Sequence, residues 1–168
     1  MPAYAALLRA VNLGSTSRIS SADLCRIATK CGFADVRTYI ASGNLLFKTD
    51  ETEVAVRDTL EQALAAHFGK PVGVFVRTHA ELAAITAQSP FADRPGTASV
   101  VLFLHKPPAA AALQRLVAPD GEEAALGTRE IYLHYPNGQG RSRLKLPALA
   151  DGTARNFTTV AKLRDLTA

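Results

Sequence analysis

A tight hairpin in the first third of the chain constrains the fold most. Residues 36–41 and 45–49 are short apolar segments of strand length. Gly43-Asn44 is a recognised two-residue hairpin loop, in which the glycine adopts a positive φ. This loop predicts a register in which Ile40 faces Phe47 and Ala41 faces Leu46.

Strand and helix patterns on both sides of the hairpin complete a β-α-β-β-α-β order. Residues 4–11 read as a strand, and a partial capping box at Ser20 begins a helix that Gly32 ends. A second helix is predicted over residues 52–68, and valines alternate through residues 72–76 as a fourth strand. This order is that of the ferredoxin-like, split βαβ unit.

The second half of the chain predicts a similar order without a last strand. Its predicted elements are a helix capped by Thr78 and Glu81, a strand over 99–104, a helix over 108–117, strands over 130–135 and 141–146, and a final helix from about Asn156. The acidic segment PDGEEAALG is predicted as a loop. The sequence therefore predicts an α+β protein with two ferredoxin-like subdomains packed together, over residues 1–77 and 78–168, the second incomplete or rearranged.

Composition and charge narrow the class of protein. The chain has 168 residues, of which 48% are hydrophobic, so it is globular. Its longest strongly apolar segment, residues 100–104, is too short to span a membrane, and Arg9 interrupts the apolar N-terminal stretch. We therefore expect a cytoplasmic protein without a membrane partner.

The charge of +4 is concentrated at the two ends of the chain. Residues 1–40 hold five basic against two acidic residues, residues 41–125 seven against ten, and residues 126–168 seven against three. This pattern favours an anionic partner if the two ends share one face, and a solvated basic surface if they do not.

The usual catalytic and cofactor motifs are absent from the sequence. It contains no HExxH, CxxC or GxxxxGK[ST] motif, and its four histidines fall on different predicted elements. Cys25 and Cys31 are six residues apart, on different faces of one predicted helix. We therefore predict no catalytic residue, metal or cofactor, and the question of enzyme activity stays open.

Three polar clusters are candidate ligand sites, and topology predicts the first. In a β-α-β-β-α-β unit, the end of the first strand and the hairpin meet at one edge of the sheet. This places Asn12 and the loop through Arg18 beside Ser42 and Asn44. The alternative is turn chemistry, in which Asn and Ser bond to local backbone groups.

The second cluster is the alternating segment RSRLKL. If it is a strand, Arg141, Arg143 and Lys145 share one face at a spacing of about 7 Å. Such a row follows a nucleic-acid backbone, or protects a sheet edge from aggregation. No row of exposed aromatic residues accompanies it, which disfavours stacking on single-stranded nucleic acid.

The third cluster lies at the predicted start of the last helix. Arg155, Thr159 and Lys162 fall on one helical face, beside Asn156. A cation at a helix N-terminus costs about 0.3–1 kcal/mol unless an anion is near. Asp151 or the phosphate of a ligand is the predicted anion.

Five segments together resemble a known family. They are LLRAVNLG, TYIASGNLLF, the pair Pro90-Phe91, GRSRLKLP and TARNFTTVAKL, which span nearly the whole chain. The chain is similar to the bacterial domain-of-unknown-function family 1697, although Ala10 and Ser15 replace usual glycines, Arg143 a usual lysine and Phe157 a usual tryptophan. The resemblance implies two ferredoxin-like α+β subdomains and no established activity.

The clusters favour a binding module for an anionic ligand, either nucleic acid or a phosphorylated metabolite. The alternatives are a protein-interaction or structural domain, and an enzyme without a recognisable motif. Fold class alone does not decide between them.

Overall fold

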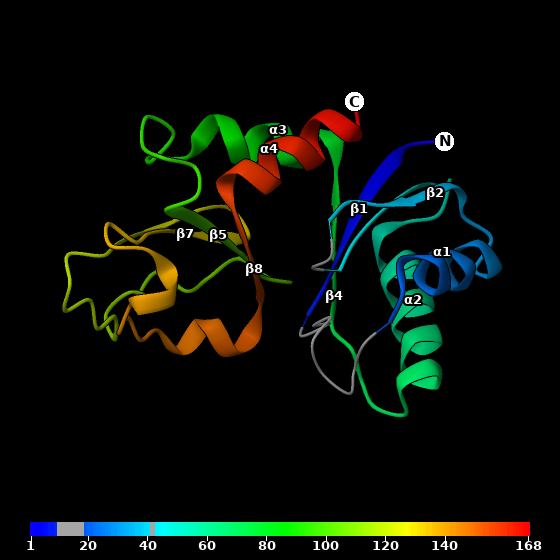
Figure 1. The fold of residues 1–168 in the computed structure, drawn as a ribbon, viewed down its shortest axis with the longest axis horizontal. Coiled ribbons are helices and arrows are strands. Elements are labelled where there is room, and N and C mark those ends of the chain that lie inside the picture. Colours follow the sequence, from blue (N-terminus) through cyan, green and yellow to red (C-terminus); the bar gives the residue numbers. More distant parts are fainter. Residues whose placement is uncertain (10–18, 41–42) are drawn as a thin grey trace. The chain divides into compact units, whose positions relative to one another are not determined.

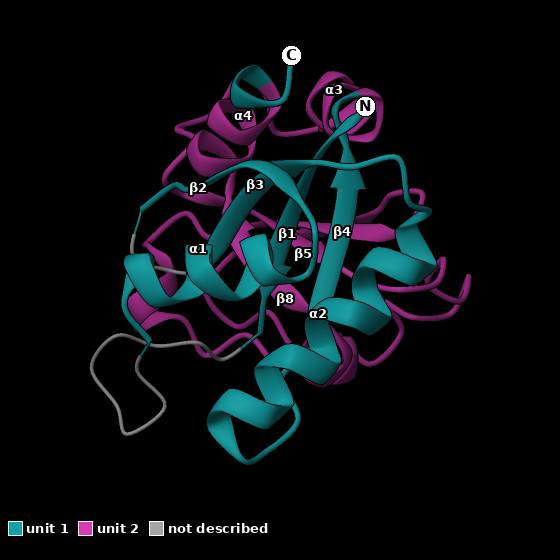
Figure 2. Cartoon of the chain, turned by 90° about the vertical axis from the view of Figure 1, so that its right-hand side faces the viewer, with its two compact units in different colours: residues 1–79, 165–168 teal, residues 80–164 magenta. Residues whose placement is uncertain are grey.

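The computed structural model describes residues 1–9, 19–40 and 43–168. Within them the protein is α+β, with two four-stranded antiparallel sheets and four α-helices (Figure 1). The chain divides into two compact units (Figure 2). Unit 1 comprises residues 1–79 and 165–168, and unit 2 comprises residues 80–164.

Unit 1 has the β-α-β-β-α-β order predicted from the sequence. Its elements are β1 (Ala3–Leu8), α1 (Ser21–Lys30), β2 (Ala34–Thr38), β3 (Asn44–Lys48), α2 (Glu53–Phe68) and β4 (Val74–Thr78). The strands pair antiparallel in the order β2-β3-β1-β4. Side-chain caps begin both helices, since Ser20 Oγ accepts from the Asp23 amide and Thr52 Oγ1 from the Ala55 amide.

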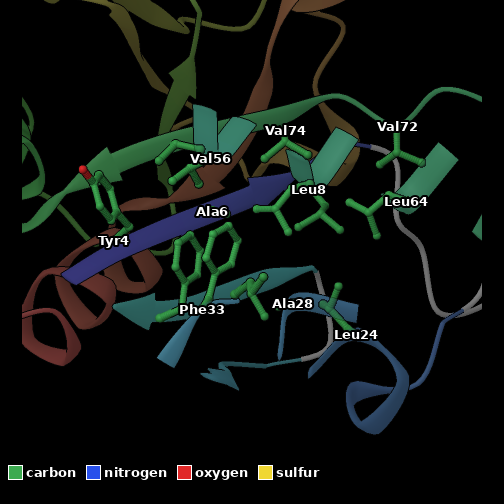
Figure 3. Close-up of a cluster of buried hydrophobic side chains, with 14 of the residues drawn as sticks. Tyr4, Ala6, Leu8, Leu24, Ala28, Phe33, Val56, Leu64, Val72 and Val74 are labelled. Atoms are coloured by element: carbon green, nitrogen blue, oxygen red, sulfur yellow. The ribbon is translucent and has the colours of Figure 1, made fainter. Parts of the chain in front are cut away.

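Both helices of unit 1 pack on one face of its sheet and close a hydrophobic core (Figure 3). Alternate strand residues such as Ala6, Leu8 and Val74 meet Leu24 of α1 and Leu64 of α2 there. Three aromatic rings join the core at the other end of β1. Phe47 stacks on both Tyr4 and Phe33, with ring centroids 5.9 Å and 4.5 Å apart.

The predicted hairpin forms, but the strand register that we predicted for it is wrong. Thr38 pairs with Leu45, and the Tyr39 amide donates to the Asn44 carbonyl at 3.1 Å. Asn44 is therefore a strand residue and not part of a two-residue loop, and Ile40 does not face Phe47. Ile40 leaves the strand with a φ of 47°. The positive φ predicted for Gly43 is confirmed at 81°.

Unit 2 is built from the elements that follow β4. They are α3 (His79–Gln88), β5 (Ser99–Phe103), β6 (Glu123–Leu126), β7 (Glu130–His134), the 3₁₀ helices η1 (Gln139–Arg141) and η2 (Pro147–Asp151), β8 (Thr153–Asn156) and α4 (Phe157–Leu166). The strands pair antiparallel in the order β6-β7-β5-β8. The sheet therefore has four strands and is rearranged relative to unit 1, because its last strand precedes its last helix.

Three of our predictions for unit 2 are wrong. Residues 108–117 form successive tight turns instead of a helix, with amide-to-carbonyl bonds from Ala112 to Ala109 and from Leu116 to Leu113. Residues 141–146 are not a strand, because they pair only through an isolated bridge between Lys145 and Val117. The segment predicted as a loop supplies β6, and β8 forms where we predicted the start of the last helix.

The two faces of the unit 2 sheet are covered differently. One face packs against α3 and α4, where Tyr132 donates its hydroxyl to the Ile85 carbonyl at 2.8 Å. The other face carries an apolar cluster formed by Val100, Leu102, Leu104, Ile131, Leu133, Tyr135 and Leu146. It is covered by the turn segment and by η2, through Leu113, Leu116, Ala148 and Leu149. Within the described residues, no helix has the length and apolar character needed to cross a membrane.

Candidate functional site

Most of the first predicted cluster lies outside the described residues. Asn12, Arg18 and Ser42 belong to the part that the structure does not describe. Asn44 is fully buried, and its side-chain amide donates to the Tyr39 carbonyl at 3.1 Å. This is the turn chemistry that we gave as the alternative. A ligand role for the cluster stays a prediction.

The second cluster is held by an acidic segment that the sequence analysis treated only as a loop. Arg143 donates to the Asp120 carboxylate from Nη2 at 2.9 Å and from Nε at 3.4 Å. This bidentate pair lowers the pKa of Asp120 from its usual value. The Ser142 hydroxyl donates to the Glu122 carboxylate, and that bond lowers the pKa of Glu122. The segment 141–146 is therefore fixed by ion pairing and hydrogen bonding.

The predicted row of three cations along a strand does not form. Arg143 is paired with Asp120, and the Lys145 backbone exchanges two hydrogen bonds of 2.9 Å with Val117. Arg141 ends η1 and lines a small pocket of about 250 Å³ together with Asp120 and Glu122. Arg143 lines it too, so two carboxylates offset the two guanidiniums, which makes this pocket a weaker anion site than its arginines alone suggest.

The third cluster is divided between a strand and a helix. Arg155 lies in β8, opposite Val101, and not at the start of α4. Its buried guanidinium donates from Nη1 to Thr153 Oγ1 and to the Ala154 carbonyl, both at 2.9 Å. Burial lowers the pKa of Arg155 to about 10, so it keeps its charge at neutral pH.

The start of α4 is closed by a side chain of the protein itself. Asn156 Oδ1 accepts from the Thr159 amide at 2.8 Å, which occupies one of the helix-terminal donors. Thr159 is buried and Lys162 is exposed, so the structure separates these two members of the cluster. Ligand binding by the remaining donors stays a prediction.

A larger groove lies in unit 2, where we predicted no site. It has a volume of about 710 Å³. One wall comes from residues 104–115 and the other from η2, through Pro147, Ala148 and Asp151. Leu104, a core residue with 6% of its surface exposed, reaches the groove. The groove therefore opens onto the apolar core beneath the sheet.

The local sequence explains why this space is not filled. Pro107 and Pro108 lack amide donors, and the chain after them runs in tight turns. Alanines follow at positions 109–112, and their side chains end at Cβ. Pro147 begins η2 on the other wall. Small and proline side chains on both walls leave the groove open, and the motif KPPAAAA was the signal available in the sequence.

Two cations line the groove without partners. Lys106 and Arg115 are exposed, and neither has an ion pair or a side-chain hydrogen bond within the described part of the chain. Among the lining residues that the structure describes, Asp151 is the one carboxylate. A comparable groove in unit 1, of about 420 Å³, differs in this respect. Its Lys48 pairs with Asp35 at 3.6 Å, and its Arg37 donates to the Leu166 carbonyl at 2.6 Å.

Comparison with protein families gives a match over residues 1–132 to the model of a protein of unknown function, DUF1697. The chain belongs to this family. The matched range includes the turn segment that forms one wall of the groove.

A solved structure shows the same fold. It is that of the conserved bacterial protein SP0830 from Streptococcus pneumoniae, with a TM-score of 0.82 and 22% sequence identity. The similarity covers 99% of this chain and 98% of that chain. A comparison with curated proteins finds no match.

One row of side chains in this DUF1697 member has the residue types of a hydrolytic site. Ser99 Oγ lies 3.3 Å from Nδ1 of His134, and Glu123 of β6 lies opposite His134 of β7 in the strand register. However, Ser99 and His134 are only 2% and 7% exposed, and the Phe91 ring covers His134 with a centroid distance of 5.6 Å. Glu123 is paired with Arg94. No substrate reaches this serine, so the row is a structural network of the sheet.

Proposed function

We propose that this protein is a binding module for a small anionic ligand and that the ligand binds in the groove of unit 2. The observation that carries the proposal is a groove with room for a small molecule and with two cations on its walls. The groove volume of about 710 Å³ falls in the range of small-molecule sites, about 300–1,000 Å³. Lys106 and Arg115 stand on its walls without ion pairs to any described residue of the chain.

The chemistry of these two cations suits phosphate or carboxylate groups. A guanidinium binds both by two parallel hydrogen bonds, and an ammonium adds a compact charge. The apolar walls reduce the screening of these interactions by water. With the histidine neutral, the wall of residues 104–115 carries a net charge of +2, against one carboxylate on η2.

Nucleic acid fits the geometry less well than a small molecule does. The row of bases that would follow a phosphate backbone is interrupted by the Arg143–Asp120 pair. The aromatic residues that would stack bases are also missing from the groove, since no Phe, Tyr or Trp is among its described lining residues. The phosphorylated metabolite is therefore the better of our two original ligand classes.

We also propose that both units belong to the ferredoxin-like fold class. The order β2-β3-β1-β4 in unit 1, with both helices on one face, supports a ferredoxin-like class for that unit. A rearranged version of the same class accounts for unit 2, and residues 1–77 and 78–168 are then the two subdomains.

Thermal unfolding in phosphate tests the proposed function. If phosphate binds with a Kd of about 10 mM, then about 50 mM phosphate stabilises the protein by about 1 kcal/mol. For a unit of this size, that raises Tm by about 4–8 °C. Sodium chloride at equal ionic strength should give no comparable increment.

Variants assign the increment to a site. Lys106→Ala and Arg115→Ala should each reduce it, and the double variant should lose it. Lys30→Ala is the matched control, because Lys30 is also exposed and lies in unit 1. Retention in the double variant with loss in Arg141→Ala would move the site to the RSRLKL segment. Retention in the double variant with loss in Arg155→Ala would move it to β8, where Arg155 lies.

A further inference from the structure

We infer that the ligand of this groove is an anionic amphiphile, with one phosphate or carboxylate head and a flexible aliphatic tail. The inference rests on the proposed function and adds the chemical class of the ligand. It is carried by two cations, without ion pairs among the described residues, that lie beside mostly aliphatic walls.

The walls favour an aliphatic tail. Apart from its charged and amide side chains, the groove is lined by Leu104, Pro107, Pro108, Ala109, Ala111, Ala112, Pro147 and Ala148, with His105. Leu104 and Ala148 also belong to the apolar cluster on this face of the sheet. A tail lying along them would extend the hydrophobic core of unit 2, which is favourable in proportion to the apolar area removed from water.

The same walls disfavour other classes of anion. A nucleotide base stacks best on an aromatic ring, and no Phe, Tyr or Trp is among the described lining residues. The Arg115 guanidinium, which could also stack a base, is needed for the anionic head. An inorganic anion would use Lys106 and Arg115 but would leave the aliphatic walls in contact with water. A neutral amphiphile would do the reverse and leave both cations unpaired.

The head is expected on the wall of residues 104–115. That wall carries Lys106 and Arg115, whereas Asp151 on η2 repels an anion. The tail then extends between the turn segment and η2. Charge complementarity therefore fixes which end of the ligand meets which wall.

A homologous ligand series tests this class with the intact protein. Inorganic phosphate and butyl, hexyl and octyl phosphate are titrated by calorimetry. The alkyl phosphates are kept below their critical micelle concentrations. We expect affinity to rise about 2- to 4-fold per methylene, the upper value being that of complete burial. Octyl glucoside, which has the tail without the charge, should bind at least about 10-fold more weakly than octyl phosphate.

A pair of neighbouring alanines supplies matched variants. Ala109 and Ala110 are both exposed, but only Ala109 lines the groove. Ala109→Gln places a polar side chain in the path of the tail and should flatten the increment per methylene. Ala110→Gln changes the same segment and should leave the increment as in the wild type.

The outcomes separate the inference from the proposed function. Equal affinity for phosphate and octyl phosphate, abolished by Lys106→Ala with Arg115→Ala, would keep the anion site and overturn the amphiphile. Equal binding of octyl glucoside and octyl phosphate would overturn the role of charge. Tighter binding of adenosine monophosphate than of octyl phosphate would overturn the aliphatic class. Failure of all the anions to bind would overturn both proposals.

Discussion

The two units of this protein cover similar sheets in different ways. In unit 1, α1 and α2 close one face of the sheet, and the core there reaches fully buried residues such as Leu60 and Leu64. In unit 2, α3 and α4 cover one face, but the other is covered by tight turns and by η2. Several residues of this second cover, including Leu113 and Leu149, are only half-buried.

The charges of the two units differ in parallel. The cations that line the unit 1 groove are occupied by Asp35 and by the Leu166 carbonyl. Those of the unit 2 groove have no partner in the described chain. A cover without α-helices therefore accompanies both the larger space and the uncompensated charge. This difference is why we place the ligand in unit 2.

The largest expected effect compares the two covers directly. Leu64→Ala removes a fully buried side chain beneath α2 and should lower the free energy of unfolding by about 3–4 kcal/mol. Leu113→Ala in the turn segment should cost only about 1 kcal/mol, because that side chain is half-buried and its site can relax. Urea unfolding followed by circular dichroism measures both. Equal losses would show that the cover of turns and η2 is packed as tightly as the α-helical one.

The second-largest expected effect lies where η2 joins the sheet of unit 2. Gly152 links η2 to β8, and a Cβ atom there would lie 2.2 Å from the Phe103 carbonyl oxygen. Gly152→Ala should therefore cost about 2–3 kcal/mol in the free energy of unfolding, through displacement of backbone. Gly140→Ala is the control, because a Cβ atom there meets nothing within 4 Å. A neutral Gly152→Ala would mean that η2 is free to move away from the sheet.

A smaller effect is expected at the hairpin of unit 1. Gly43 has a φ of 81°, which a β-branched residue resists. Its carbonyl also accepts the Leu8 amide at 2.9 Å, so the turn is tied to the end of β1. Gly43→Val should lower the free energy of unfolding by about 1 kcal/mol or more. An unchanged urea midpoint would remove the constraint that we assign to this turn.

The smallest effect is the pH dependence that the acidic segment gives to unit 2. The pKa of Asp120 is lower in the folded protein than its usual value, chiefly through the hydrogen bond from Arg143. Its contribution to stability is therefore complete above the unfolded pKa of about 4 and is lost as the pH falls through the folded pKa. Asp120→Asn should reduce the loss of stability below about pH 4.

Two arginine variants control that experiment. Arg143→Ala should reduce the acid-dependent loss as Asp120→Asn does, and the double variant should add little, since both remove one pair. Arg141→Ala should leave the dependence unchanged, because Arg141 has no partner within the described residues. Full additivity of the two single variants would show that the pair does not link the segments. Stability would be followed as the urea midpoint between pH 6 and pH 3.

The elements of unit 1 were predictable because their signals are local. Ser20 and Thr52 cap their helices, Gly69 ends α2 with a φ of 70°, and apolar residues recur at the right period. The hairpin register was not predictable in this way. It depends on Asn44, whose side chain bonds to Tyr39 and draws the residue into the strand.

The errors in unit 2 come from pairing over long sequence distances. The alanines of 109–112 favour a helix by propensity, but packing of Leu113 and Leu116 on the sheet favours turns. β6 contains two alanines, which are poor strand formers, and forms because β7 lies beside it. β8 likewise forms by pairing with β5, more than 45 residues away, and takes Arg155 out of the helix.

The candidate site shows the same limit. Charge patterns located Arg141, Arg143 and an acidic segment, but not the contacts that Asp120 and Glu122 make with residues about 20 positions later in the chain. The groove depends on the approach of η2 to the turn segment, and no local pattern reports that approach. Lys106 and Arg115 become notable only because the fold leaves them without partners beside an apolar wall.

An NMR titration with octyl phosphate tests the central claim most directly, because backbone amides report the position of the ligand. Binding in the unit 2 groove predicts saturable shifts that concentrate in residues 104–115 and 148–151. These shifts should be lost in the Lys106→Ala, Arg115→Ala double variant, whose remaining spectrum should match that of the wild type. Saturable shifts concentrated in residues 138–145 or around Arg37 and Lys48, or the absence of saturable shifts, would contradict the account.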